Sequence, residues 1–376
     1  GDVFKQSRYH TAAIGKWHLG LGFAKQGEAF DYTQAIEDGP NELGFDHFYG
    51  IPASLDFPPY IFIENDRPTA MPSLKQAGLS FPTYLRPGER APNLVMEEAL
   101  DHLTKRATDY IHWRAKAKTP FFLYFPLTSP HKPVIPHRRF AGKSGIGPYG
   151  DFVMQTDWTV GEVLRALDEA KIAENTLVIF TSDNGSFMHR LDDPNLPGHS
   201  QDPKEQAYQS TVHRANNDLR GTKADVWEGG HRVPFFARWP EVIQSSSTCK
   251  ETICHVDLMA TCADLLDHEL PEDAAEDSFS WLPLFKGNAW PTPRAPVINH
   301  SASGMFAIRM GPWKLVHGNG SGGRENPRGK PDEGPFQLYQ LDNDPMEQTD
   351  LASKHPDKVT EMTVKLMALR TSGRSR

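Results

Sequence analysis

The chain has 376 residues, of which 38% are hydrophobic and 23% are charged, and its formal net charge is -8. This composition supports a buried core and excludes a wholly disordered chain. The acidic balance and the lack of a long basic run argue against nucleic acid as the main partner. No apolar stretch is long enough to form a membrane-spanning helix.

The chain opens with GDVFKQSRYH, without an initiator Met and without a signal segment. Because DVFKQSR is typical of the last turns of a helix, we expect the true N-terminus to lie upstream of Gly1. The cysteines are Cys249, Cys254 and Cys262, an odd number without C-x-x-C spacing. They predict neither a disulfide framework nor a zinc site, and we expect buried or idle thiols.

Short apolar runs between turn-forming residues predict strands at 10–14, 120–125, 176–182 and 233–239. Helical spacing of apolar residues predicts helices at 94–116, 151–170 and 256–267. Strands that alternate with helices favour an α/β fold, with a large, mostly parallel sheet between helices. Ligand sites in such sheets lie beyond the carboxyl ends of the strands.

The pattern changes toward the C-terminus. MFAIRM, WKLVH and FQLYQL indicate short antiparallel strands, and a final helix is expected at about 355–370. We therefore expect a main α/β domain at 1–288 and a C-terminal α+β subdomain, a small antiparallel sheet plus a helix, at 289–376. The polar segment 186–222 indicates a long loop, which in a compact domain is usually functional or mobile.

The segment GKWHLG, residues 15–20, directly follows the first predicted strand. If the strand continues, side chains two apart share a side, so Lys16 and His18 would converge while Trp17 turns into the packing. A cation beside an imidazole suits an anion or an activated hydroxyl. The alternative is a structural turn with a solvated lysine and a packed histidine, which the spacing alone slightly favours.

The segment TSDNGS lies where the third predicted strand ends. Asp183 and Asn184 offer adjacent carboxylate and amide oxygens, which suit a hard cation such as Ca²⁺ or Mg²⁺. Two ligands do not complete such a site, so further oxygens must come from elsewhere. The alternative is an Asx turn with Gly185 in a left-handed conformation.

Two further motifs flank predicted strands. SPHKP places His131 just past strand 120–125, and LRGTKADVWEGGHRVP places Lys223 before strand 233–239. Lys223 is a candidate anion ligand, whereas Glu228 and Arg232 are expected to form an internal ion pair. Two lysines, two histidines and a partial hard-cation site together predict an enzyme acting on a tetrahedral oxyanion ester.

These motifs and FQLYQLDNDPMEQTDLA resemble those of the formylglycine-dependent sulfatases, the arylsulfatase A-like branch of the alkaline phosphatase superfamily. They occur in that family's order across nearly the whole chain. The resemblance implies a sulfuric ester hydrolase of the arylsulfatase type, with an alkaline phosphatase-like fold. It also implies a bound Ca²⁺, with Mg²⁺ as the alternative, and a formylglycine nucleophile.

The resemblance further implies a role for each matching residue. Lys16 and His18 would contact the hydrated formylglycine, and His18 would be the base that releases sulfate. His131 and Lys223 would bind the substrate sulfate, with Lys223 balancing charge on the bridging oxygen. Asp183 and Asn184 would ligate the metal, and Asp183 would also help to protonate the leaving oxygen.

The chain departs from the family at one essential point. It contains no C/S-x-P-S/A-R pattern, the source of the nucleophile, and it lacks the paired aspartates that complete the family's calcium site. In family members both lie upstream of the segment that resembles GKWHLG. We therefore expect an N-terminally truncated chain that is inactive by itself.

Two other functions stay open. One is a phosphoric ester hydrolase of the same superfamily, disfavoured because SDNG suggests a single metal rather than two. The other is a non-catalytic protein that binds sulfated glycans. The motif that the upstream sequence carries would separate these possibilities.

For partners, the resemblance implies a sulfated small molecule or sulfated glycan and a formylglycine-generating or related maturation enzyme. It also implies export to a periplasm or beyond. His300, in NHSASG, is a candidate for substrate binding. The loop offers further candidates, each with a solvated loop position as the alternative: His189, Arg190, His199, His213 and Arg214.

Overall fold

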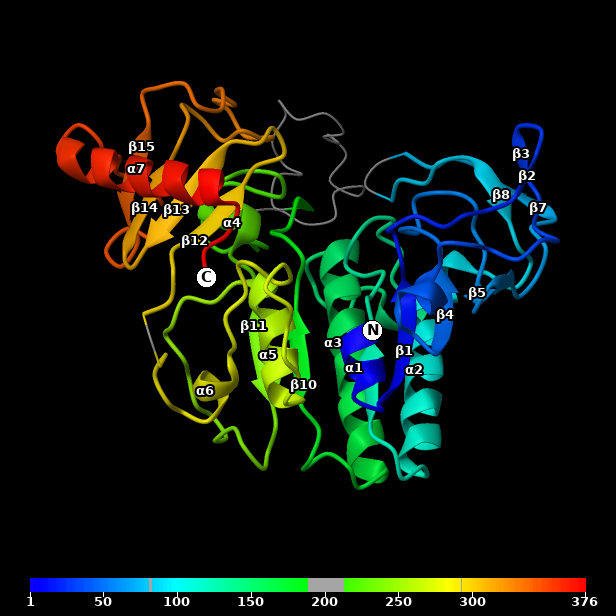
Figure 1. Cartoon of the computed structure of the whole chain (residues 1–376). Coiled ribbons are helices and arrows are strands. Elements are labelled where there is room, and N and C mark those ends of the chain that lie inside the picture. Colours follow the sequence, from blue (N-terminus) through cyan, green and yellow to red (C-terminus); the bar gives the residue numbers. More distant parts are fainter. Residues whose placement is uncertain (81–82, 189–212, 292) are drawn as a thin grey trace. The chain divides into compact units, whose positions relative to one another are not determined.

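The computed structural model of the chain describes residues 1–80, 83–188, 213–291 and 293–376. They form two compact units (Figure 1). The first unit comprises 1–174, and the second comprises 175–188 and 213–376, in each case within the described residues. The domain boundary predicted after residue 288 stays a prediction.

The first unit contains a five-stranded sheet in the order β6-β5-β4-β1-β9. β1 pairs in parallel with both β4 and β9, whereas β5 and β6 join in antiparallel fashion. The elements are α1 (Asp2–Gln6), β1 (His10–Lys16), β2 (Lys25–Gln26), β3 (Ala29–Phe30), β4 (His47–Ile51), β5 (Ile63–Glu64), β6 (Arg67–Pro68), β7 (Leu74–Gln76), β8 (Gly88–Arg90), α2 (Ala99–Ala115), β9 (Phe121–Tyr124) and α3 (Pro148–Glu169).

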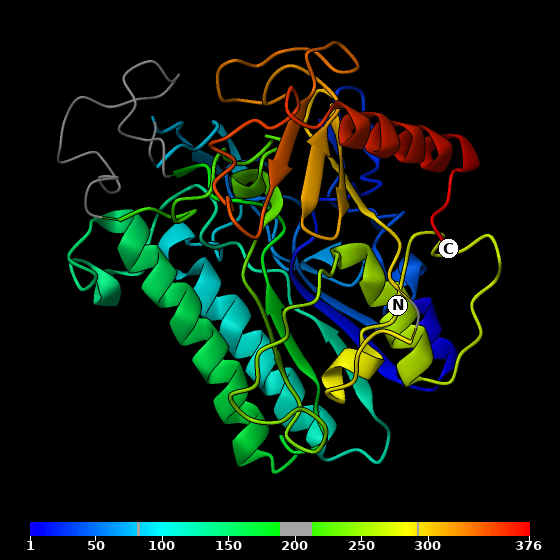
Figure 2. The same ribbon diagram turned by 90° about the vertical axis from the view of Figure 1, so that its left-hand side faces the viewer.

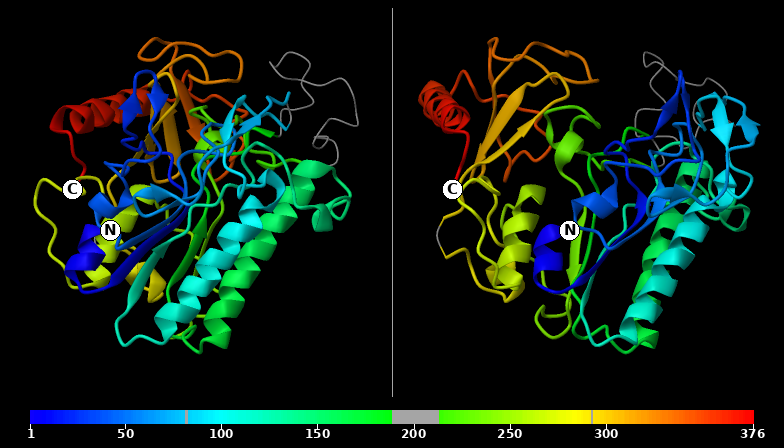
Figure 3. Two further views of the ribbon diagram at one scale, coloured as in Figure 1. Left: turned by 90° about the vertical axis from the view of Figure 1, so that its right-hand side faces the viewer. Right: turned by 45° about the vertical axis from the view of Figure 1, so that its right-hand side comes forward.

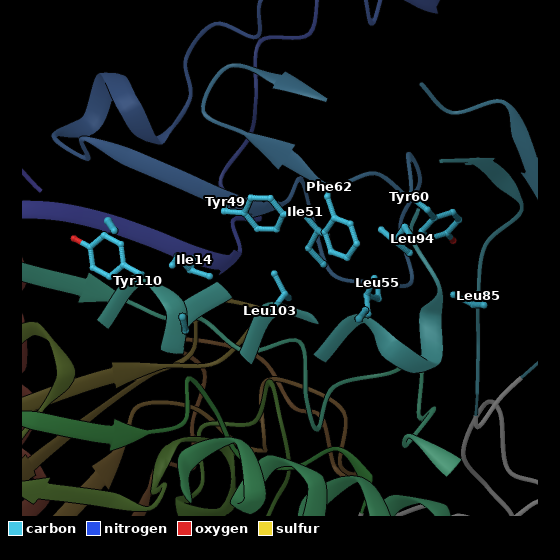
Figure 4. Close-up of a cluster of buried hydrophobic side chains, with 13 residues drawn as sticks. Ile14, Tyr49, Ile51, Leu55, Tyr60, Phe62, Leu85, Leu94, Leu103 and Tyr110 are labelled. Atoms are coloured by element: carbon cyan, nitrogen blue, oxygen red, sulfur yellow. The ribbon is translucent and has the colours of Figure 1, made fainter. Parts of the chain in front are cut away.

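β1 lies between β4 and β9, and its small and β-branched residues are buried on both faces of the sheet. Ile14 and Tyr49 pack with α2 residues such as Leu103 in one cluster, which Figure 4 shows. The neighbouring residues Ala13 and Phe48 belong to a second cluster. Burial of each large side chain stabilises the fold by about 1.5–3 kcal/mol, so the two clusters fix the register of β1 and therefore the place where it ends.

α2 and α3 are the long helices of the first unit, and they lie side by side in Figure 2. Leu100, Leu103 and Ala107 recur at helical spacing on the buried side of α2. Thr104 of α2 and Thr159 of α3 share a buried hydrogen bond of 3.0 Å. Both helices were predicted from the same periodicity.

The second unit contains two antiparallel sheets, β10-β11 and β12-β13-β14-β15. α7 lies against the four-stranded sheet in Figure 3. Its Met362 and Leu366 are buried in one cluster with Ile308, Leu315 and Leu338 of that sheet. The elements are β10 (Val178–Thr181), α4 (Glu228–His231), β11 (Phe235–Arg238), α5 (Leu258–Leu265), α6 (Leu282–Phe285), β12 (Val297–His300), β13 (Phe306–Met310), β14 (Trp313–Val316), β15 (Gln337–Gln340) and α7 (Pro356–Ser372).

The α/β fold with a mostly parallel core and a small C-terminal antiparallel sheet is confirmed. The helix expected at the start of the chain is present as α1, and the three cysteines are free thiols, of which Cys249 is exposed and Cys254 and Cys262 are half-buried. Among the described strands of four or more residues, β4 and β12 were not predicted, and neither were the shorter strands β2, β3, β5, β6, β7 and β8. In the described part of the chain, no helix is long and apolar enough to cross a membrane.

Candidate functional site

In the first unit, the segment GKWHLG contains the last two residues of β1, Gly15 and Lys16, and the turn that follows. The backbone N–H groups of residues 16, 17 and 18 donate in turn to the carbonyls of Pro126, Ile51 and Pro52. These carbonyls lie at the carboxyl ends of β9 and β4 or just beyond, so the turn is held at the carboxyl edge of three parallel strands. Gly15 has a φ of +135°, and a Cβ there would lie 2.1 Å from the Pro126 carbonyl oxygen, so only glycine fits.

Trp17 is buried, as predicted, but His18 departs from strand geometry. His18 has a φ of +59°, in the left-handed region, and its side chain is exposed. The rule that alternate side chains share one side of a strand therefore applies up to Lys16 and not to His18. Contacts with Ser54 orient the imidazole instead.

Ser54 fixes where the proton of His18 lies. The Ser54 backbone N–H donates to Nδ1 of His18 at 3.1 Å, and the Ser54 hydroxyl lies 2.9 Å from the same nitrogen. A ring nitrogen that accepts from a backbone N–H carries no proton itself, so neutral His18 is protonated at Nε2. Neutral His18 is therefore a hydrogen-bond donor through Nε2, and taking a proton at Nε2 would first require the loss of that hydrogen.

His131 has the opposite arrangement. Its Nδ1 lies 2.7 Å from the Lys132 carbonyl oxygen, which only accepts, so Nδ1 carries the proton. Nε2 is then the nitrogen that accepts or delivers a proton. The buried carboxylate of Asp56 lies 3.9 Å from His131 Nδ1. The segment 52–57 thus contacts both predicted histidines, His18 through Ser54 and His131 through Asp56.

In the second unit, Asp183 and Asn184 follow β10, as predicted. Asp183 is exposed and Asn184 is half-buried, and within the described residues neither side chain makes a hydrogen bond. Their oxygens are therefore available to a hard cation. Gly185 is not in the left-handed region, so the alternative Asx turn of that kind does not form.

Gly185 is needed for a close approach. Its N–H donates to the Gly230 carbonyl at 3.0 Å, and a Cβ on Gly185 would lie 1.7 Å from the Gly229 carbonyl oxygen. Asn216 adds a second clamp, because its side chain donates to and accepts from the backbone of Ser186. The turn with Asp183 and Asn184 is thus fixed on α4 and on Asn216.

Lys223 lies on a loop that is braced at both ends. Asp225 accepts from the backbone N–H groups of Thr222 at 2.9 Å and of Arg324 at 2.5 Å. The Ala302 N–H donates to the Ala224 carbonyl at 2.9 Å, which joins the segment after His300 to this loop. Among the described residues, the half-buried Lys223 ammonium has no hydrogen bond or ion pair of its own.

α4 connects this loop to the Asp183 turn. The Gly229 N–H donates to the Arg220 carbonyl at 2.6 Å, and a Cβ on Gly229 would lie 2.3 Å from the Gly221 carbonyl oxygen. The adjacent Gly230 accepts from Gly185. The two glycines therefore let the backbones of the turn and the loop meet on one short helix.

A buried charge cluster of Glu228, Lys314 and Glu347 anchors α4. Lys314 Nζ lies 2.9 Å from Glu228 Oε1 and 2.8 Å from Glu347 Oε1, and all three side chains are at most 2% exposed. The Glu228 backbone N–H donates to Glu347 Oε2 at 2.6 Å. The predicted ion pair between Glu228 and Arg232 is also present, at 3.6 Å.

The electrostatics of this cluster depend on Lys314. Burial opposes ionisation of Glu228, but the charge and hydrogen bond of Lys314, together with His231 and Arg309, outweigh it and lower the pKa of Glu228 to about 2. Burial raises the pKa of Glu347 above its ordinary value, in spite of Lys314. The two glutamates in turn raise the pKa of Lys314 against the effect of its burial. Lys314 therefore stays charged and keeps Glu228 ionised.

The lowered pKa of His231, beside this cluster, predicts that the stability of the fold depends on pH. Burial and then the Lys314 charge lower the pKa of His231 to about 3, from 6.5. The unfolded chain therefore binds a proton below pH 6.5 that the folded chain does not, so stability decreases as the pH falls from 6.5 toward 3. Because His231 is partly exposed, we expect His231→Gln to remove on the order of 1 kcal/mol of the loss between pH 7 and 5.

Urea denaturation at the two pH values measures this difference. His268→Gln, a histidine of the same unit outside the cluster, is the matched control and should lose as much stability as the wild type. The explanation would be contradicted by the same pH dependence in His231→Gln and wild type.

The predicted site residues thus form two groups. Lys16, His18 and His131 belong to the first unit, and Asp183, Asn184, Lys223 and His300 belong to the second. No group of three or more His, Cys, Asp or Glu side chains able to hold a metal is found within the described residues. Of the loop candidates, His189, Arg190 and His199 lie outside the described residues, and Arg214 pairs with Asp218.

Sequence reasoning missed Ser54, Asp56 and Asn216. Ser54 and Asp56 follow β4, a strand that was not predicted, so nothing marked them as neighbours of a strand end. Asn216 lies in a polar loop where it looks like any solvated amide. An Asn a few residues before a glycine-bearing turn, as Asn216 stands before LRGT, is a weak signal of such a clamp.

Comparison with known proteins shows which family the chain matches. A family model described as "Sulfatase" matches residues 1–268. The chain is 32% identical to an N-acetylgalactosamine-6-O-sulfatase of Bacteroides thetaiotaomicron, with 98% of this chain and 76% of that protein covered. It is 28% identical to the steryl-sulfatase of Homo sapiens, over 82% of this chain and 58% of that protein.

A solved structure is also similar, a sulfatase described in work on glycosaminoglycan metabolism by Bacteroides thetaiotaomicron. It superimposes with a TM-score of 0.81 at 28% sequence identity, over 98% of this chain and 81% of that one. The chain therefore spans three quarters or more of the bacterial relatives and a little over half of the human one.

Proposed function

The chain belongs to the sulfatase family, and on that premise we propose that it contributes the binding and proton-transfer groups of an enzyme that hydrolyses sulfate esters of glycans. The single observation that carries the proposal is the joint anchoring of Lys223 and the Asp183 turn on α4. A cationic side chain and a pair of free oxygens held by one rigid support suit a tetrahedral anion and a hard cation.

We propose as sulfate-binding donors the Lys16 ammonium and the Nε2–H of His18 in the first unit, and the Lys223 ammonium in the second unit. The positions of their hydrogens support this, since His18 donates only through Nε2 in its neutral form. His131, whose Nδ1 carries the proton shared with the Lys132 carbonyl, is proposed to deliver a proton through Nε2 to the departing alcohol oxygen. His300 is proposed as a further substrate contact, because the segment after it is bonded to the Lys223 loop.

Residues of this chain support the proposed metal site, whereas none of them matches the motif of the proposed nucleophile. Asp183 and Asn184 fit Ca²⁺, or Mg²⁺, because their oxygens are unengaged among the described residues, and a bound cation would supply positive charge next to the sulfate. The 376 residues contain no C/S-x-P-S/A-R pattern, so they offer no precursor of that kind for formylglycine. Whether the precursor is Cys or Ser follows from the full gene sequence, as does the need for a maturation enzyme. Export from the cytoplasm is proposed from the family alone.

Metal binding gives a prediction that does not depend on turnover. Added Ca²⁺ should raise the Tm of the full-length protein after treatment with EDTA, because a ligand that binds only the folded state stabilises it. Asp183→Ala should abolish this shift. Asp264→Ala, at an exposed aspartate bonded to Ser280, should preserve it. A full Ca²⁺ shift in Asp183→Ala would reject the assignment.

The function itself is tested with a pair of matched esters. The full-length protein should release inorganic sulfate from N-acetylgalactosamine 6-sulfate and no phosphate from the 6-phosphate. Phosphate release as the faster reaction would support the phosphoric ester hydrolase instead. Tight binding of the sulfated sugar without any release would support the non-catalytic glycan-binding protein.

A related prediction concerns the chain of residues 1–376 by itself. It should bind the sulfated sugar without releasing sulfate, because none of its residues provides the expected nucleophile. Assays of this chain and of the full-length protein, at equal concentration and with Ca²⁺, compare the two. Turnover by residues 1–376 at a rate similar to that of the full-length protein would show that the nucleophile is a residue of this chain.

A further inference from the structure

The guanidinium of Arg86 is held on three sides in the first unit. It donates through Nη1 to Asp56, to Oδ2 at 2.6 Å and to the backbone carbonyl at 3.2 Å. The Cζ atom of Arg86 lies 3.7 Å from the centroid of the Phe57 ring and 5.1 Å from that of the Tyr84 ring. Asp56 is 1% exposed and Arg86 is 35% exposed. Arg86 is therefore fixed by a buried carboxylate while part of it reaches solvent.

One edge of this guanidinium is available. Among the described residues, all of its hydrogen bonds run through Nη1, so Nε and Nη2 have no partner. These two nitrogens present parallel N–H groups that match two oxygens of a carboxylate or a sulfate. Because the side chain is already ordered, binding such a group costs little further side-chain entropy.

The charge of Arg86 is also only partly balanced by Asp56. Lys132 Nζ lies 3.7 Å from the same carboxylate, so one negative charge is shared between two cations. His131 approaches the other carboxylate oxygen at 3.9 Å. Asp56 is thus contacted by Arg86, Lys132 and His131 together.

Phe57 contacts both Arg86 and His18, a residue of the predicted site. The His18 ring lies edge-on to the Phe57 ring, with centroids 5.5 Å apart, and Arg86 lies against the same ring. Phe57 is 37% exposed, so it also offers an aromatic surface to the apolar face of a sugar. A ligand with one anionic group at His18 can therefore reach Arg86 with another.

We infer that Arg86 is a specificity-determining residue that binds a second anionic group, a carboxylate or a further sulfate, of a sulfated glycan. The inference rests on the proposed function, since it takes His18 to face the sulfate that is removed. Asp56, Phe57 and Tyr84 position the guanidinium, and the Nε–Nη2 edge makes the contact. The competing explanation is that Arg86 serves only to neutralise Asp56.

Three substrates distinguish these explanations in the full-length protein. N-acetylgalactosamine 6-sulfate carries one anionic group. N-acetylgalactosamine 4,6-disulfate adds a sulfate, and a uronic acid linked to N-acetylgalactosamine 6-sulfate adds a carboxylate. The last two show which of the two groups Arg86 binds.

The informative variant is Arg86→Lys, because it keeps a positive charge beside buried Asp56 and so preserves folding, but it removes the planar pair of donors. We expect the KM for at least one substrate with a second anion to rise about tenfold, as loss of a ground-state contact does, with kcat unchanged. The KM for the singly charged sugar should change less than about twofold. Arg67→Lys, which changes an exposed arginine bonded to the Thr33 carbonyl, is the control.

An equal effect of Arg86→Lys on all three substrates, or no effect on any, would overturn the inference and leave Arg86 a structural residue. If the wild-type protein releases sulfate from none of them, the proposed function fails separately. Calorimetric Kd values for the same sugars then test Arg86, with the same expected pattern between the singly and doubly charged ligands.

Discussion

Replacing Lys223 with Ala is expected to lower kcat/KM for sulfate ester hydrolysis by about 10²- to 10⁴-fold, the range seen when a preorganised charge is removed from a reacting anion. The ammonium is half-buried on a loop fixed by Asp225 and α4, and no carboxylate of the described residues neutralises it. Its charge is therefore available to the substrate.

The control for this variant is Lys330→Ala, at an exposed lysine paired with Glu333 in the same unit, which should keep full activity. Equal Tm values for wild type and Lys223→Ala would show that the fold is intact. Lys223→Arg should retain part of the activity because it keeps the charge. A near wild-type rate in Lys223→Ala would remove Lys223 from the site.

Replacing Lys314 with Met is expected to lower the free energy of unfolding by about 3–5 kcal/mol, because it leaves two buried glutamates without their cation. Lys314 is 1% exposed, and its partners Glu228 and Glu347 are equally buried. The pKa of Glu228, which Lys314 helps to lower to about 2, should rise in the variant. Urea denaturation at pH 7 measures the loss.

The matched control is Lys358→Met, at a surface lysine of α7 paired with Glu361, which should cost less than about 1 kcal/mol. The triple variant Lys314→Met/Glu228→Gln/Glu347→Gln should recover much of the stability, because it removes the unpaired charges as well. A loss of less than 1 kcal/mol in Lys314→Met alone would show that the buried charge cluster does not anchor α4.

The sequence predicted those helices and strands that a local pattern of residues identifies. β1, β9, β10 and β11 are compact apolar runs between turn formers, and α2 and α3 carry an unbroken helical period. β4 was missed because HFYGI is short, contains a glycine and lacks alternation, since both faces of the strand are buried. Its stability comes from pairing with β1, a long-range contact that no local pattern encodes.

The residues of the candidate site also fall into those that the local sequence predicts and those that it does not. The residue types at strand ends, Lys16, His131 and Asp183, were predictable because strand ends were predictable. The position of His18 was not, since β1 ends two residues before it and the His18 backbone is left-handed. The pairing of Arg86 with Asp56 and of Lys314 with Glu228 and Glu347 joins residues far apart in the chain. Only the folded chain shows that these charges meet.

The most direct test of the central claim is hydrolysis of N-acetylgalactosamine 6-sulfate by the full-length protein in ¹⁸O-labelled water, followed by mass spectrometry of both products. Attack at sulfur predicts that the label enters inorganic sulfate and that the sugar hydroxyl stays unlabelled. Label in the sugar, or no release of sulfate at all, would contradict the proposal that this protein hydrolyses sulfate esters at sulfur.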